Sequence, residues 1–255
     1  NLLFGMLIAK EKLVTVIRPK RNSLHPSGPS VPKFPSFEPS PTQDIHLVIN
    51  MISSSTSFQS VESWTPICLP KFNNRAFLHT YISFLGPDLC LVCLSPNKDA
   101  FFEMSDYRHR IAQTLEGTNC VEGIDDAIRD DGYNIVDLEV PGLRHFVFKS
   151  RNLGQYTVPA RSPPYTMERD WQRLLTLYQY AHGKMHQREL PAKTVFQVTE
   201  AETVIATLTT TYEAYATFGP LVSKATAASG LHAMTKWARR QRHHDALFIT
   251  NSPVF

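Results

Sequence analysis

The sequence is poor in cysteine and has no long apolar run. Four cysteines among 255 residues are too few for a disulfide framework, so a reducing cytosol is favoured. No apolar stretch reaches the about 20 residues that a membrane-spanning helix needs. The apolar start "NLLFGMLIA" lacks a basic region and a small-residue cleavage site, which argues against a signal peptide. Because the chain begins without Met and enters a strand-like run at once, we expect it to be a piece of a longer protein.

The sequence also lacks an excess of one charge and lacks the common cofactor motifs. Its 26 Lys and Arg against 23 Asp and Glu give a formal net charge of +3, which does not indicate a dedicated nucleic-acid binder. Neither a GxxxxGK[ST] nor a GxGxxG pattern occurs, and the ten histidines form no HExxH or spaced Cys/His set. We therefore expect no nucleic-acid partner, no cofactor, no metal and no stand-alone nucleotide hydrolysis.

Proline, in contrast, is concentrated in one place. Six prolines occur among the sixteen residues of "PSGPSVPKFPSFEPSP", positions 26–41. A segment of Pro, Ser and Gly cannot build a core, so it is predicted to be a disordered or extended loop insertion, with room for an unrecognised regulatory site.

Apolar periodicity predicts a first unit of order β-β-α-β-β-β-α-α ending near Asp130. A helix from Thr42 carries apolar residues at helical spacing, and further helices are expected from near Lys98 and over Val121–Arg129. The expected strands are Leu2–Ala9, Leu13–Ile17, Thr65–Phe72, Phe77–Leu85 and Leu89–Ser95.

A second unit then repeats nearly the same order. Its helices are expected over "SPPYTMERDWQRLLTLYQYAHGKMHQ" and from about Leu221 to His243. The apolar stripe of the last helix should pack on the sheet. The expected strands are His145–Lys149, Gln155–Val158, Thr194–Val198, Thr203–Leu208 and Tyr212–Thr217. The prediction is an α+β chain of two tandem domains, residues 1–130 and 131–255, each a five-stranded antiparallel sheet with helices on its faces.

This order resembles that of the longin fold. The segments "NLLFGMLIAKEKLVTVIRPK", "SLHP" joined across the insertion to "DIHLVINMISSS", "ESWTPICLPKFN", "LRHFVFKS", "PYT" and "FGPLVSKA" resemble the Mon family of vacuolar and endosomal fusion proteins. They are spread over nearly the whole chain in family order. The chain is similar to the second and third of that family's three longin domains, and it departs from the family pattern by its Pro-rich insertion.

The resemblance implies a role in vesicle traffic. Together with a Ccz-type longin subunit, the Mon family forms the guanine-nucleotide exchange factor for the late-endosomal and vacuolar Rab GTPase, on membranes marked by phosphoinositides. The first longin domain, which this chain does not resemble, is the one implied in exchange, so no catalytic residue is assigned. A longin-containing adaptor or tether without exchange activity is the alternative.

The cysteines are the first candidates for reactive groups. Cys68 has Lys71 nearby, but alternation along a strand would place the two side chains on opposite faces, and a small buried residue is favoured. "CLVC", Cys90 to Cys93, has redox spacing but lies in a predicted strand, with its thiols on opposite faces. An inert Cys68 is expected, which disfavours a cysteine-dependent hydrolase or oxidoreductase.

Two groups of basic residues are candidates for contact with anionic lipid head groups. In "KWARRQRHH" the spacing i, i+3, i+4 and i+7 predicts one stripe on the last helix, whereas an ordinary solvated face is the alternative. The second group flanks the first hairpin and is expected to form two patches at its opposite ends. The two groups are Lys236, Arg239, Arg240 and His243, and Lys10, Lys12, Arg18, Lys20 and Arg21.

Prolines also mark one predicted strand as an edge. Pro66, Cys68 and Pro70 share one side of it, and proline is tolerated where its missing N–H would face an open edge. Trp64 stands at the entrance to this edge, and tryptophan is frequent at binding hot spots. We expect these four residues to receive a partner, the early-endosomal Rab GTPase in its GTP form; a Trp that closes the core is the alternative.

Overall fold

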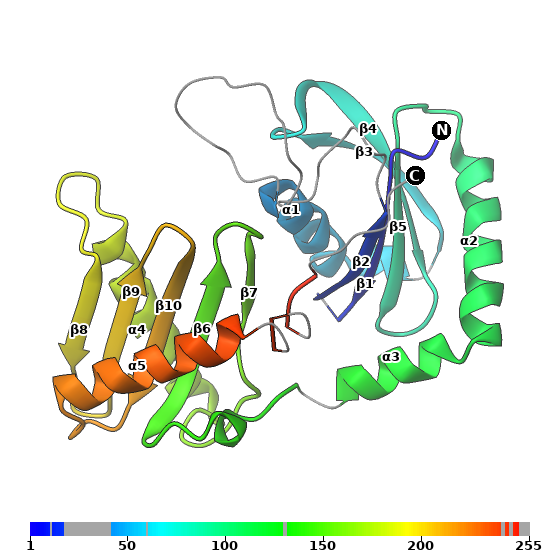
Figure 1. The fold of residues 1–255 in the computed structure, drawn as a ribbon. Coiled ribbons are helices and arrows are strands. Elements are labelled where there is room, and N and C mark those ends of the chain that lie inside the picture. Colours follow the sequence, from blue (N-terminus) through cyan, green and yellow to red (C-terminus); the bar gives the residue numbers. More distant parts are fainter. Residues whose placement is uncertain are drawn as a thin grey trace. The chain divides into compact units, whose positions relative to one another are not determined.

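A computed structural model describes residues 1–10, 12–17, 42–59, 61–129, 132–240, 243–244 and 247–249. The Pro-rich insertion 26–41 and three predicted lipid contacts, Arg18, Lys20 and Arg21, lie outside these ranges. The chain divides into two compact units with the boundary at Asp130 and Asp131. Each is described by itself (Figure 1).

The first unit is a five-stranded antiparallel sheet of order β2-β1-β5-β4-β3. Its central strand β5 is buried along its whole length, as expected for a continuous apolar run covered on both faces. A short 3-10 helix, Thr56–Gln59, precedes β3. The elements are β1 (Phe4–Ala9), β2 (Lys12–Ile17), α1 (Thr42–Ser53), β3 (Ser63–Leu69), β4 (Asn73–Phe84), β5 (Leu89–Ser95), α2 (Phe101–Gly117) and α3 (Cys120–Arg129).

Helices cover both faces of this sheet, with α1 and α2 on opposite sides (Figure 1). The α1 face packs through Val48 and Ile52 against Phe4, Ile82 and Val92. The α2 face packs through Met104 and its neighbours against the other side of β4 and β5. Side chains therefore alternate between two apolar layers along each strand.

The second unit repeats the arrangement, with the order β7-β6-β10-β9-β8. Helix α5 packs on one face through apolar residues that include Leu231 and Met234, and α4 covers the other through Leu174 and Tyr178. The elements are β6 (Leu143–Ser150), β7 (Gln155–Thr157), α4 (Glu168–Met185), β8 (Thr194–Val198), β9 (Thr203–Leu208), β10 (Tyr212–Phe218) and α5 (Lys224–Arg239), with a 3-10 helix at Ile135–Leu138. The predicted class, two α+β units with five-stranded antiparallel sheets, is confirmed.

Several predicted elements have other bounds than expected: α4 covers Glu168–Met185 and not the whole of 162–187, and two further differences affect the candidate sites. Strand β3 stops at Leu69, so Pro70 and Lys71 lie in a turn and not in a strand. Helix α5 stops at Arg239, because Arg240 adopts an extended backbone with ψ of 133°. The amide of His243 then donates to the carbonyl of Arg240 at 2.9 Å, in a separate turn. This break brings the buried Phe248 into the core of the second unit, where it packs near Phe148.

Candidate functional site

The open edge of the first sheet begins with β3, which pairs only with β4 among the described strands. Pro66 lies opposite His79 and is exposed, and an irregularity between Ile67 and Leu69 leaves Cys68 without a register partner. Pro66, Cys68 and Pro70 were predicted to share one side of the strand. This is wrong for Pro70, because β3 ends at Leu69 and Pro70 lies in the turn that follows.

A buried carboxylate explains why the strand ends there. Asp44, in the first turn of α1, is 1% exposed, and its Oδ2 accepts hydrogen bonds from the amides of Lys71 at 3.0 Å and Phe72 at 2.7 Å. These two amides turn toward α1 instead of continuing the strand ladder. The strand-alternation argument for Cys68 and Lys71 does not apply, because Lys71 lies in the turn.

Trp64 is half-buried and closes the end of the core. Its indole N–H donates to the carbonyl of Lys98 at 2.9 Å, and its ring stacks on His79 and meets the edge of Phe101. The exposed apolar residue on the same face is Phe77 of β4, at 67% exposure. Trp64, Pro66, Phe77 and His79 are called the edge surface below. The sequence does not single out Phe77, because an exposed aromatic in an apolar strand looks like core.

The basic residues of the last helix do not form the predicted single stripe. Lys236, Arg239 and Arg240 are exposed, but the half-buried His243 lies beyond the end of α5 and stacks on Trp237 with ring centroids 4.5 Å apart. The Arg239 guanidinium lies over the Tyr212 ring, 5.4 Å from its centroid. Two cations, those of Lys236 and Arg240, have no such aromatic contact among the described residues.

Lys10 and Lys12 flank the tip of the β1–β2 hairpin, and both are exposed. Lys10 adopts a left-handed backbone, φ 43°, while its amide donates to the carbonyl of Asp88 at 2.9 Å. The hairpin turn therefore presents two ammonium groups at one end of the first sheet.

The thiols of "CLVC" face opposite sides of β5, as predicted. Cys90 belongs to the core under α1 and Cys93 to the core under α2. Burial raises the pKa of both thiols to about 12, so they are neutral at physiological pH. Neutral thiols on opposite faces form neither a nucleophile nor a redox pair.

The sequence alone does not reveal polar groups buried on the α4 face of the second sheet. Glu202 is fully buried, and it accepts hydrogen bonds from Arg173 Nε at 3.0 Å and from the Tyr165 hydroxyl at 2.9 Å. Glu213 of β10 is 3% exposed and lies close to His182 of α4 and to His186, the C-cap residue of that helix. The i, i+4 spacing of the two histidines is visible in the sequence, but their partner comes from a strand distant along the chain.

Comparison with known proteins gives two family matches, which together cover more than half of the chain. Residues 41–113 match the family "Second Longin domain of FUZ, MON1 and HPS1", and residues 142–242 match the family "Third Longin domain of FUZ, MON1 and HPS1". Among the described residues, no helix is long and apolar enough to cross a membrane.

Curated relatives align along nearly the whole chain. The human "Vacuolar fusion protein MON1 homolog A" is 38% identical over 98% of this chain and 36% of its own length. The Takifugu rubripes "Protein SAND" is 36% identical over 98% of the chain and 45% of its own length, and the Cryptococcus neoformans "Vacuolar fusion protein MON1" is 34% identical over 100% and 39%. The chain thus spans less than half the length of these relatives. It belongs to the family of FUZ, MON1 and HPS1, of which it carries the second and third longin domains.

Proposed function

We propose that this chain is the non-catalytic longin platform of a guanine-nucleotide exchange factor subunit that acts on the late-endosomal and vacuolar Rab GTPase. It assembles with a Ccz-type longin subunit and works at the surface of late endosomes and vacuoles. The observation that carries the proposal is the similarity to vacuolar fusion proteins along 98% of the chain, through two consecutive longin units. Cys90 and Cys93, with neutral thiols, offer no cysteine nucleophile.

Co-expression with a Ccz-type subunit tests assembly. We expect the two chains to co-purify, and we expect the chain alone to leave the release of fluorescent GDP from the late-endosomal Rab GTPase unchanged. Acceleration of GDP release by the chain alone would contradict the non-catalytic assignment. Absence of a complex would favour the alternative, a longin-containing adaptor or tether.

We assign membrane docking to the exposed cations at the end of α5. Each basic residue near an anionic surface contributes roughly 1 kcal/mol, so Lys236, Arg239 and Arg240 suffice for weak recruitment but not for anchoring. The ammonium groups of Lys10 and Lys12 provide a second contact from the hairpin turn.

Charge reversal tests the docking role with a matched control. Lys236→Glu combined with Arg240→Glu should lower partition onto phosphoinositide vesicles by at least about 30-fold, the effect of about 2 kcal/mol. Lys184→Glu combined with Arg188→Glu, two exposed residues elsewhere in the same unit, should change it less. Equal loss in both double variants would show a general charge effect and refute a defined docking surface.

Recruitment by the GTP-bound early-endosomal Rab is assigned to the edge surface. Phe77 and Pro66 are exposed there, and Trp64 is half-buried. The exposed ring of Phe77 offers side-chain contacts to a partner. Pro66 has no backbone N–H, which discourages the addition of a further strand.

Phe77→Asp is a sharper variant than Trp64→Ala, because Trp64 also closes the core. We expect Phe77→Asp to abolish retention of the chain by immobilised GTP-loaded Rab. Leu221→Asp, at a residue 97% exposed in the other unit, should retain it. Unchanged retention of Phe77→Asp would refute this surface.

A further inference from the structure

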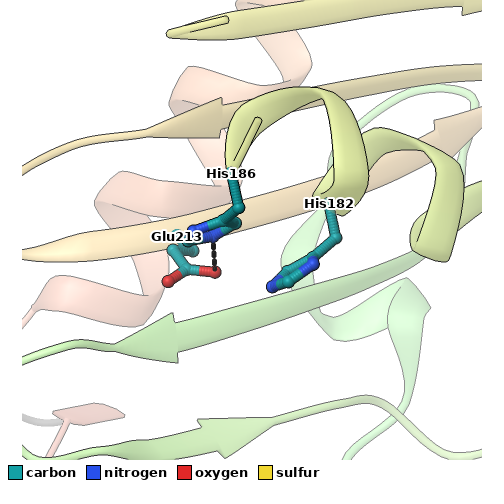
Figure 2. A group of neighbouring side chains, drawn as sticks. All are labelled: His182, His186 and Glu213. Atoms are coloured by element: carbon teal, nitrogen blue, oxygen red, sulfur yellow. Dashed lines mark ion pairs between the residues drawn. The ribbon is translucent and has the colours of Figure 1, made fainter. Parts of the chain in front are cut away.

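His182, His186 and Glu213 converge on the α4 face of the second sheet. The histidines lie four residues apart at the C-terminal end of α4, with His186 as its C-cap residue, and their rings stack with centroids 4.1 Å apart. Glu213 lies on β10 with its carboxylate toward them; Figure 2 shows both rings extending from the helix toward the strand that carries it. The ligand atoms of the three residues all lie within 4.8 Å of one another.

We propose that these three residues form a binding site for a divalent transition-metal ion of the zinc class. Imidazole nitrogens and a carboxylate oxygen are donors that zinc accepts, with three protein ligands and one open position. Zinc–ligand bonds of about 2.0–2.2 Å place neighbouring donor atoms roughly 3.5 Å apart. His182 is exposed, so rotation of its side chain brings the donors to that spacing without movement of the backbone.

Both carboxylate oxygens of Glu213 have partners, and Oε2 is the oxygen that faces His186. Its Oε1 lies 3.5 Å from Lys149 Nζ and 3.9 Å from Arg151 Nε. Its Oε2 accepts the Tyr215 hydroxyl at 3.1 Å and faces His186 Nε2 at 3.3 Å. An ion bound here would replace the contact between His186 Nε2 and Oε2. The two neighbouring cations oppose a dication, so we expect weaker binding than at a structural zinc site.

An ordinary ion pair between His186 and Glu213 is the simpler explanation, but it does not account for the position of His182 next to both residues. His182 lies beside both residues of that pair: its ring stacks on the ring of His186, and the ligand atoms of all three residues lie within 4.8 Å of one another. Lys184 lies between the two histidines in sequence, but its ammonium group is directed over the Tyr180 ring, 5.7 Å from the centroid. It therefore does not occupy the position of the ion.

Titration of the purified chain with Co²⁺ and Zn²⁺ tests the site. We expect visible d–d absorption from Co²⁺ in a low-coordinate environment, displacement by Zn²⁺, and a higher thermal midpoint in the presence of Zn²⁺. His182→Gln and His186→Gln should each weaken binding by at least about tenfold and remove the thermal shift. His232→Gln, at an exposed histidine of α5, should leave both unchanged.

Several outcomes would overturn the proposal. Absence of binding by the wild-type chain would leave only the ion pair. Binding by both histidine variants with the affinity of the wild type would identify an adventitious ion only. A measurement of the metal-free thermal midpoint separates loss of the site from loss of folding. Because both histidines are exposed, we expect this midpoint to stay close to that of the wild type. If one variant is destabilised, the metal affinity of the other variant tests the site.

Discussion

Gly230 lies within α5, where the absence of a side chain lets the helix approach the second sheet. A Cβ at this position would stand 2.7 Å from two ring carbons of Phe218 and 3.3 Å from Val140 Cγ1, whereas ordinary contact begins at 3.4 Å. Phe218 is fully buried, so displacement of its ring would disturb the core around it. Gly230→Ala therefore places a methyl group into an occupied core.

Two opposing effects set the magnitude. Alanine in place of glycine in a helix stabilises by about 1 kcal/mol, whereas an extra carbon in a packed core costs about 1–3 kcal/mol. We expect Gly230→Ala to lower the free energy of unfolding of the second unit by about 1 kcal/mol. At Gly183, in α4, a Cβ would meet no described atom within 4 Å, so Gly183→Ala should raise it by about 0.5–1 kcal/mol.

Urea denaturation in a Trp64→Phe background measures this difference. The chain has three tryptophans, and this substitution leaves Trp171 and Trp237, both in the second unit, to report by fluorescence. With a slope of about 2 kcal/mol per molar urea, the midpoints of the two alanine variants should differ by about 1 M. A Gly230→Ala midpoint equal to or above that of Gly183→Ala would refute the close packing of α5 on Phe218.

Other predictions concern single buried or exposed groups. In the native chain a thiol reagent should modify the exposed Cys120 first, and Cys90 and Cys93 only after unfolding, as mass spectrometry can show. Asp44→Ala removes the carboxylate that accepts from the amides of Lys71 and Phe72, of which only the Phe72 amide has another acceptor, the carbonyl of Leu69 at 3.1 Å; it should destabilise the first unit by about 1–3 kcal/mol, measured by urea denaturation. Burial lowers the pKa of His145 from 6.5 to about 4. Between these two pH values the unfolded state binds a proton at this imidazole and the native state does not. Stability of the second unit should therefore fall by about 3 kcal/mol between about pH 6.5 and pH 4, and His145→Gln should remove that part of the fall, whereas an unchanged pH profile would place the histidine in contact with water.

Strands bounded by clear turns were predictable from the sequence. The bounds of β5, β8 and β9 agree with the prediction to the residue, because each apolar run is interrupted by turn residues such as "GPD", "TEAE" and "TTT". The end of β3 was not predictable in this way. It depends on Asp44, which lies 27 residues before Lys71, and no local pattern shows that a helix carboxylate captures two strand amides.

The candidate sites were also predictable only in part. The exposed cations Lys236 and Arg240 were visible as a run of basic residues, but that run does not show that Arg240 is extended and that α5 ends at Arg239. The group around Glu213 required knowledge of which strand lies under α4. Residues that meet through the fold, from elements far apart in sequence, are those that periodicity does not bring together.

The hydrogen bonds of Asp44 have a practical consequence for the insertion that precedes α1. They attach the first turn of that helix to the β3–β4 turn, so we expect the position of α1 to be independent of how many residues come before it. Closing a loop of twice the length costs only about 0.6 kcal/mol more. Positions 26–41 are therefore a suitable place to introduce a fluorescent protein, an affinity tag or a protease site while the longin units keep their fold.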